Sequence, residues 1–149
     1  MKNTRERLLA DLGADRPFLC SLATVGEDGS PRVRFVRAKL DHYVILRVPT
    51  FLETRKVVDI RGEPRVHVTC GATDSSRPGT YYQIDGSAEI STEPSEREAA
   101  WTPRLSKWFS DSDDPNYVVV KVTPTQIVAL PIGRAGEASI WRASGDPGI

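Results

Sequence analysis

The pattern of apolar and polar residues begins with one short helix and continues mostly in the alternation of β-strands. Leu8, Leu9 and Leu12 repeat at helical spacing behind Asn3 and Glu6, which form an N-terminal capping pair. After the glycine that ends this helix, strand-like runs are separated by turn-forming residues. The predicted strands cover residues 18–25, 32–40, 43–48, 65–70, 80–91, 117–122 and 126–130.

Short connections join most of these strands. Residues 26–31 and the pair Asp41-His42 predict tight turns, so we expect the first three strands to form an antiparallel meander. Gly86 interrupts the fifth strand and indicates a bulge. The Thr123-Pro124-Thr125 segment is expected to separate the last two strands.

Two further helical segments are expected between strands. Thr54 is the predicted N-cap of a helix that ends at residues 62–64. Ser95 and Glu98 predict a capping box for a second helix, which restarts at Pro103 and continues through Trp108. The tail, residues 131–149, has no clear period and is expected to be partly disordered.

These elements predict a mainly β (α+β) fold. Six or seven strands joined by short turns, with helices at the periphery, favour a closed or nearly closed antiparallel barrel. Because strands and helices do not alternate, a doubly wound parallel sheet is not expected. We expect a single domain over residues 1–149, with a core at 16–130.

The composition agrees with one ordinary globular domain. Its 149 residues are 39% apolar and 27% charged, which excludes a disordered, collagen-like or disulfide-scaffold chain. Because the sequence has no membrane-length apolar run and no signal-peptide pattern, we expect a cytoplasmic protein without a membrane partner. Cys20 and Cys70 lie in apolar strands and are expected to be buried free thiols.

Basic and acidic residues are equal in number, 20 of each, but they are unevenly placed. Residues 31–67 hold nine basic and four acidic residues, a net charge of plus five. Residues 85–114 hold three basic and eight acidic residues, a net charge of minus five. This asymmetry predicts a localised anion site in the first half of the chain.

The start of the second helix is the strongest candidate for that site. Arg55 and Lys56 fall in its first turn, where cations oppose the helix dipole unless an anion is bound. Free backbone amides, these two cations and the hydroxyls of Thr50 and Thr54 together make a typical phosphate cradle. The alternative is a basic turn that is simply solvated.

The second strand adds further cations. Alternation puts Arg32, Arg34 and Val36 on one face and Val33, Phe35 and Arg37 on the other. An arginine therefore intrudes on each face, and one face is expected to meet a ligand. The alternative is an edge strand whose charges protect it from aggregation.

The order of these motifs resembles the pyridoxamine 5'-phosphate oxidase-like flavin-binding split barrels, over about residues 16–130. The motifs that carry the resemblance are Asp28-Gly29-x-Pro31, Arg34-Phe35-Val36-Arg37, Thr50, Thr54-Arg55-Lys56-Val57, Glu63-Pro64-Arg65-Val66 and Gly86-Ser87-Ala88-Glu89. A later group is similar to the general-stress-protein branch of the family: Trp101-x-Pro103, Trp108-Phe109 and Asp113-Asp114-Pro115.

The resemblance implies a homodimer of split barrels with FMN bound at the subunit interface. It implies that Arg34 and Lys56 bind the FMN phosphate together with Thr54 and Arg55, and that Thr50 approaches the ring or the ribityl chain. The backbone of Phe35, Val36 and Arg37 would line the isoalloxazine ring.

Two positions depart from the family pattern. Tyr81 stands where the family often has a glutamine that reaches the flavin, and Pro49 replaces a common aromatic residue. Trp108 is expected either to lie beside the flavin or to pack in the core together with Trp101, seven residues earlier.

The resemblance favours an FMN-dependent oxidoreductase that uses a small-molecule substrate or electron donor. Classical pyridoxamine phosphate oxidases resemble one another in an arginine and a histidine near the C-terminus, whereas the histidines here are His42 and His67. We therefore expect negligible oxidation of pyridoxamine phosphate, and no metal site, because neither histidine has ligand spacing.

Three other hypotheses stay open: binding of another cofactor, flavin binding without catalysis, and nucleic-acid binding. The same barrel could bind the deazaflavin F420 or haem, and a flavin-binding protein need not be a catalyst. A nucleic-acid-binding barrel is disfavoured, because only Phe35 offers an aromatic platform among the arginines.

Overall fold

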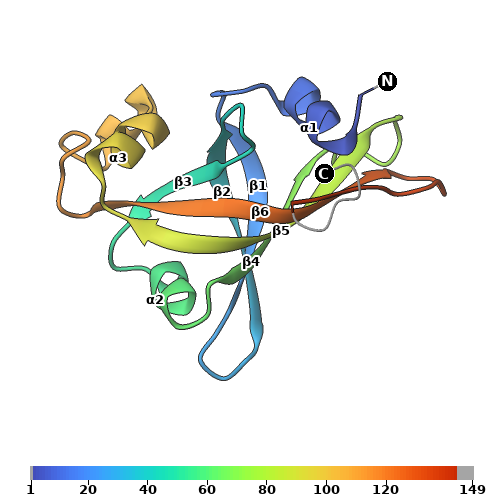
Figure 1. Ribbon diagram of the computed structural model, residues 1–149. Helices are drawn as coiled ribbons and strands as arrows, with labels where there is room; N and C mark the ends of the chain where they lie inside the picture. Colours follow the sequence, from blue (N-terminus) through green and yellow to red (C-terminus); the bar gives the residue numbers. More distant parts are fainter. Residues whose placement is uncertain (1, 144–149) are drawn as a thin grey trace.

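The computed structural model describes residues 2–143, which contain seven strands, three α-helices and one 3-10 helix (Figure 1). The elements in chain order are α1 (Thr4–Leu12), β1 (Phe18–Val25), β2 (Pro31–Leu40), β3 (Leu46–Phe51), α2 (Arg55–Gly62), β4 (Arg65–Gly71), β5 (Thr80–Ser91), α3 (Pro94–Ala100), η1 (Pro103–Lys107), β6 (Tyr117–Pro131) and β7 (Ser139–Arg142).

The strands form an antiparallel barrel, as expected. Their order is β3-β2-β1-β4-β5-β6, and β6 pairs back onto β3 to close six strands. Beyond β3, the free edge of β6 pairs with β7, so β7 is an extra strand outside the ring. In the view of Figure 1, α3 lies above and α2 below the end of β3, so two peripheral helices flank one end of the barrel.

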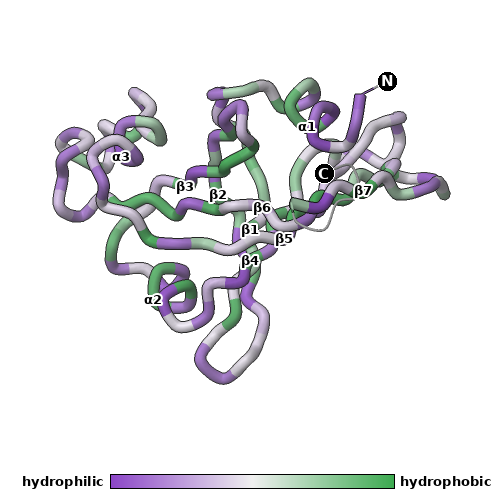
Figure 2. The backbone as a smooth tube through the Cα atoms, viewed as in Figure 1, coloured by the Kyte–Doolittle hydropathy of each residue, from purple (hydrophilic) through white to green (hydrophobic). Residues whose placement is uncertain are grey.

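The core lies inside the barrel and follows the alternation along each strand. Fully buried side chains come from every side of the ring, among them Leu22, Leu40, Val68 and Ile84. Leu8 of α1 is also fully buried and belongs to the same cluster. Figure 2 shows apolar and polar residues interspersed along the strands, as expected of strands with one face toward the core and one toward solvent.

The predicted capping of α1 is confirmed. The Asn3 side chain accepts a hydrogen bond from the Glu6 backbone, and the Glu6 side chain accepts one from the Asn3 backbone. Cys20 and Cys70 are buried free thiols, also as expected. Within residues 2–143 no helix has the length and apolar character needed to cross a membrane.

The third strand was predicted at residues 43–48, which is three residues too early. Asp41 organises a turn there, because its Oδ1 accepts hydrogen bonds from the backbone amides of Tyr43 and Ile45 at 2.8 and 3.1 Å. Val44 takes a positive φ of 67° inside this turn. The strand therefore begins at Leu46 and runs on through Pro49 to Phe51.

The last two predicted strands, 117–122 and 126–130, are in fact the single strand β6. Pro124 was expected to separate them, since proline cannot donate a ladder hydrogen bond. Instead it lies opposite Gly86, where the pairing with β5 shifts register. The bulge predicted at Gly86 is present, and it accommodates the proline without ending the strand.

Two other helical predictions need correction. The capping box of Ser95 and Glu98 is absent, because α3 begins at Pro94 with Glu93 as its N-cap and no side-chain cap bond. The helix ends at Ala100 and η1 is a separate 3-10 turn, so Trp101 and Trp108 do not share one helical face.

The tail, residues 131–149, was expected to be partly disordered; its residues Ser139 to Arg142 form β7, which pairs with β6. Residues 144–149 of that tail lie outside the described residues.

Candidate functional site

The barrel is split between β2 and β3. These strands pair only at two positions, Lys39 with Arg47 and Leu40 with Leu46. Before Lys39, β2 pairs with β1 on one edge, and its other edge is left open. An open strand edge presents unpaired backbone N–H and C=O groups, which a ligand can meet.

A cavity of about 420 Å³, the first cavity, lies at this split. That volume falls within the range of roughly 300–1,000 Å³ typical of small-molecule sites. It is lined by the open edge of β2, by β3, by Lys56 of α2, and by α3, η1 and the residues around them: Pro17, Phe35, Val36, Arg37, Ala38, Lys39, Pro49, Thr50, Phe51, Lys56, Ala100, Thr102, Pro103, Arg104, Leu105, Trp108 and Phe109.

Six of the ten sequence-predicted site residues line the first cavity: Phe35, Val36, Arg37, Thr50, Lys56 and Trp108. Arg34 and Arg55 are not in its lining, but their charges act on the same site, as described below. Thr54 and Tyr81 are also outside the lining.

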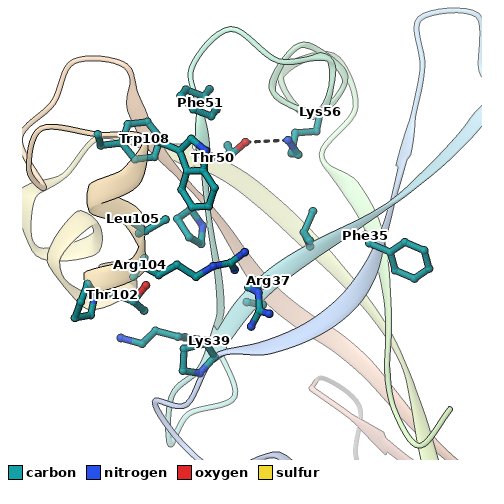
Figure 3. A pocket seen from close by; sticks show the side chains of 17 residues that line it. Phe35, Arg37, Lys39, Thr50, Phe51, Lys56, Thr102, Arg104, Leu105 and Trp108 are labelled. Carbon is teal, nitrogen blue, oxygen red and sulfur yellow. Dashed lines mark hydrogen bonds between the residues drawn. The ribbon is translucent and has the colours of Figure 1, made fainter. Parts of the chain in front are cut away.

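Lys56 is a cation without a carboxylate partner in the described part of the chain. Its Nζ donates a hydrogen bond of 2.8 Å to Thr50 Oγ1, and Figure 3 shows this contact at the wall of the first cavity. Burial lowers the pKa of Lys56, and the charge of Arg34 lowers it further. Such an environment disfavours the ammonium unless an anion binds beside it.

Arg34 is held inward by several acceptors. Its Nη1 donates to Thr24 Oγ1 at 2.7 Å and to the Leu22 carbonyl at 3.2 Å, and its Nη2 lies 3.7 Å from Asp59 Oδ2. Burial lowers the pKa of Arg34. The guanidinium is therefore fixed in position near Lys56.

Four cations gather here around one carboxylate. We call Arg32, Arg34, Arg55 and Lys56 the basic cluster; Asp59, on the inner face of α2, is the carboxylate that faces it. The charges do not balance, so the basic cluster carries an excess positive charge that attracts an anion.

The first turn of α2 adds donors to the basic cluster. Thr54 is the N-cap residue, as predicted, but its hydroxyl donates to the Phe51 carbonyl and does not cap the helix. The first turn also contains no acidic residue. Its backbone amides therefore lack a side-chain acceptor, and they suit a phosphate oxygen.

Asp59 is a buried carboxylate that holds this arrangement together. Only 2% of it is exposed, and it accepts a hydrogen bond of 2.8 Å from Thr24 Oγ1. It also pairs with Arg32 at 3.4 Å and with Arg34 at 3.7 Å. It therefore ties α2 to strands β1 and β2.

We expect Asp59→Asn to lower the free energy of unfolding by about 2 kcal/mol. The amide keeps the shape but leaves two arginine charges without their counter-ion, and the partial exposure of those arginines moderates the loss. Urea unfolding measures the change, with the exposed Asp85→Asn as the matched control. A loss for Asp59→Asn no larger than that of the control would contradict this role.

The opposite wall of the first cavity carries a second group of cations, which the sequence analysis missed in part. In Figure 3 the Arg104 side chain extends from η1 toward β2, and Arg37 of β2 also lines the cavity. Arg104 also lies over the Trp108 ring, 5.3 Å from its centre. None of the described residues that line this cavity is acidic, so both ends of it favour negative charge.

The segment formed by α3, η1 and Phe109, which we call the roof of the first cavity, is firmly attached to the barrel. Phe109 packs against Phe51 and Tyr117, with ring centroids 4.7 and 5.0 Å apart. Glu96 of α3 accepts hydrogen bonds from Arg47 and Lys121, and these bonds lower the pKa of Glu96 to about 2. These aromatic and ionic contacts therefore hold the roof in a fixed position on the barrel.

Lys39 also fixes the roof. Its Nζ donates to the backbone carbonyls of Ala99 and Trp101 at 3.2 and 3.1 Å, at the end of α3. Although Lys39 lines the first cavity, its hydrogen bonds are directed at the backbone of the roof. Trp101 itself packs edge-on against Tyr117 at 5.5 Å. Of Trp101 and Trp108, only Trp108 lines the first cavity.

Tyr81 lines a different, second cavity of about 570 Å³. Cys20, Cys70 and Arg134 line it as well, and Phe35 is shared by both cavities. Tyr81 was predicted to contact the flavin, but it does not line the first cavity of its own chain.

The two histidines lie apart from the first cavity. His67 Nδ1 is 2.8 Å from Asp85 Oδ1 on the barrel surface, and His42 is exposed in a turn. No cluster of potential metal ligands occurs among residues 2–143.

Comparisons with known proteins agree with this geometry. The family model for pyridoxamine 5'-phosphate oxidase matches residues 10–130. General stress protein 26 from Bacillus subtilis (strain 168) is 31% identical over 120 residues, which cover 80% of this chain and 84% of that protein.

Two crystal structures share the fold over nearly their whole length. General stress protein 26 from Bacillus anthracis str. Sterne matches with a TM-score of 0.72 at 25% identity, covering 93% of this chain and 97% of that chain. A putative pyridoxamine 5'-phosphate oxidase from Listeria innocua matches with a TM-score of 0.71 at 28% identity, covering 85% and 97%. The chain therefore belongs to the pyridoxamine 5'-phosphate oxidase-like family of split barrels and is a homologue of general stress protein 26.

Proposed function

We propose that the first cavity binds FMN and that the protein is an FMN-dependent oxidoreductase. The family typically binds FMN or F420. One observation carries the proposal. Lys56 has no carboxylate partner in the described chain, and the cavity that it lines contains no acidic residue. A phosphate monoester supplies the negative charge that this environment lacks.

The residues fit the cofactor in three parts. Arg34 and Lys56, with Thr54, Arg55 and the first amides of α2, would hold the phosphate. The open edge of β2 from Phe35 to Arg37 would meet the isoalloxazine ring, with Thr50 and Trp108 on the neighbouring walls. Bound FMN supplies the redox chemistry, which is the transfer of a hydride or of single electrons between a donor and an acceptor.

We also propose that the protein works as a homodimer. Leu19, Val33 and Phe35 are 60%, 67% and 79% exposed, and the register of β1 and β2 puts them on one outer face. We call them the outer β1–β2 surface. A contiguous apolar surface of this kind favours a protein partner, and the family resemblance makes a second copy of the chain the occupant.

Dimerisation on this surface would also explain how Tyr81 reaches a flavin, although it lies outside the first cavity of its own chain. Phe35 belongs to the outer β1–β2 surface and borders both cavities, so packing there brings partner residues to the edge of the first cavity. Tyr81 would then act on the cofactor of the partner protomer.

F420 is the alternative cofactor, since it also carries a phosphate. The two are separated by adding each to the cofactor-free protein and following the spectrum of the bound molecule. Uptake of F420 without uptake of FMN would replace the proposal.

Within one chain, the cations of the tail do not provide a second phosphate site at the first cavity. Arg134 lines the second cavity, and Arg142 Nε donates to Gln126 Oε1 on β6. Without a histidine beside them, they do not reproduce the substrate-holding pair of the classical oxidases. Arg37 and Arg104 remain to orient an anionic electron donor such as a nicotinamide nucleotide.

We therefore expect negligible oxidation of pyridoxamine phosphate, together with reduction of the flavin by a nicotinamide or an artificial donor. The assay incubates FMN-loaded protein with pyridoxamine phosphate under air and follows pyridoxal phosphate, with a nicotinamide nucleotide in a parallel sample. Turnover of pyridoxamine phosphate at about one per second or more would contradict the expectation.

A further inference from the structure

The two cysteines of this chain lie across from one another on neighbouring strands. The β1–β4 ladder pairs Ser21 with Thr69 and Leu22 with Val68. Continued by one residue, the same antiparallel register sets Cys20 opposite Cys70. Both side chains are buried, at 3% and 5% exposure, and both belong to the barrel core cluster, so they project from the same face of the sheet.

This placement meets the distance requirement of a disulfide. Directly opposed residues of antiparallel strands have Cα atoms about 4.5–5.5 Å apart, and disulfides need about 4.4–6.8 Å. The proximity of the sulfurs is also evident in their electrostatics, since the charge of Cys20 contributes to the raised pKa of Cys70.

The second cavity borders the strand positions of this pair from the outer side of the sheet, whereas both thiols project into the core. Cys20 and Cys70 both line it, together with Tyr81 and the start of the 71–73 segment. Hydrogen peroxide has only two heavy atoms and fits easily in about 570 Å³. Leu19 and Phe35 of the outer β1–β2 surface line this cavity too, so peroxide enters it when that surface is uncovered.

We propose that Cys20 and Cys70 are a redox modification site, at which peroxide forms an intramolecular disulfide between β1 and β4. The thiolate of one cysteine attacks a peroxide oxygen, the O–O bond breaks, and a sulfenic acid and water result. The sulfur of the second cysteine then displaces water from the sulfenic sulfur. Overall, two thiols and one hydrogen peroxide give one disulfide and two waters.

The disulfide would close the part of the chain that carries the proposed phosphate site. Residues 20–70 include β2, β3 and α2, and hence Arg34, Thr50 and Lys56. Closing a loop of this length restricts the unfolded chain, so the oxidised form is more stable. The modification does not depend on flavin, and its test is independent of the proposed function.

Oxidation is expected to be slow at neutral pH. Burial raises the pKa of both thiols to about 12, which leaves only a very small thiolate fraction. The rate should therefore rise about tenfold for each pH unit between pH 7 and 9. A sustained oxidant, and not a brief pulse, is the condition to which such a pair responds.

The test exposes the native full chain to hydrogen peroxide, then denatures it, alkylates free thiols and measures the intact mass. We expect chains that take up no alkyl label, migrate as single chains on a non-reducing gel and recover two labels after dithiothreitol. The thermal midpoint should rise by roughly 5–12 °C relative to the same protein in reductant.

The reduced wild-type protein is the matched control, so no variant has to fold for the test to decide. In Cys20→Ala and Cys70→Ala, peroxide should leave the thermal midpoint unchanged. Retention of two free thiols, oxidation to sulfinic acid without a disulfide, or a disulfide only between chains would each overturn the proposal.

Discussion

Replacing Lys56 by alanine should weaken FMN binding by about 1.5–3 kcal/mol, which is roughly a 10- to 150-fold rise in Kd. The substitution removes a charge-assisted hydrogen bond to the phosphate, and among the described residues no other lysine lines the phosphate end of the cavity beside α2. Isothermal titration of the cofactor-free protein with FMN measures the effect. Arg61→Ala is the matched control, because Arg61 is an exposed cation in the last turn of the same helix.

Arg34→Ala is expected to weaken FMN by a similar amount, and it needs one more check. Because Arg34 also pairs with Asp59, its loss affects the fold as well as the ligand. The far-ultraviolet circular dichroism and unfolding midpoint of the variant separate the two effects. If the double variant of Arg34 and Lys56 bound FMN like the wild type, the phosphate assignment would be wrong.

The second large effect is expected on assembly. Wild-type protein should be a dimer at micromolar concentration with a total interface well above about 1,600 Å², and Phe35→Glu should convert it to monomers. The substitution places a charge at the centre of the outer β1–β2 surface, where an apolar contact would bury it. Light scattering coupled to size-exclusion chromatography measures the mass.

Tyr43→Glu is a close control for this prediction. Tyr43 is also aromatic and is 79% exposed like Phe35, but it lies in the turn before β3. It should leave the dimer intact. A wild-type protein that is monomeric at micromolar concentration would refute the proposed assembly, and a Phe35→Glu variant that stays dimeric would refute the surface.

Local patterns predicted most of the barrel. The strands at 18–25 and 80–91 and the capped helix α1 were placed correctly, because alternation, turn residues and caps are encoded within each segment. The errors occur where a contact between residues far apart in the sequence determines the local structure. Pro124 stays inside β6 because Gly86 lies across from it on β5, and the sequence around Pro124 does not contain that information.

The same distinction holds for the candidate site. Thr50 and Lys56 could be predicted, because both flank one strand-to-helix connection and the structure joins them by a hydrogen bond. Arg104 was missed, since its place in the cavity depends on how η1 packs over β2 and β3. Tyr81 was assigned through family resemblance, and the position of β5 in the ring sets it at the second cavity.

The most direct measurement is the visible spectrum of the purified protein, followed by titration of the cofactor-free form with FMN. The proposed function predicts a yellow protein with flavin absorption, one FMN per chain at saturation, and loss of tight binding in Lys56→Ala. A protein without a visible chromophore that takes up no FMN at about 100 μM, a concentration well above typical cofactor affinities, would contradict it. A haem spectrum, or uptake of F420 alone, would contradict it equally.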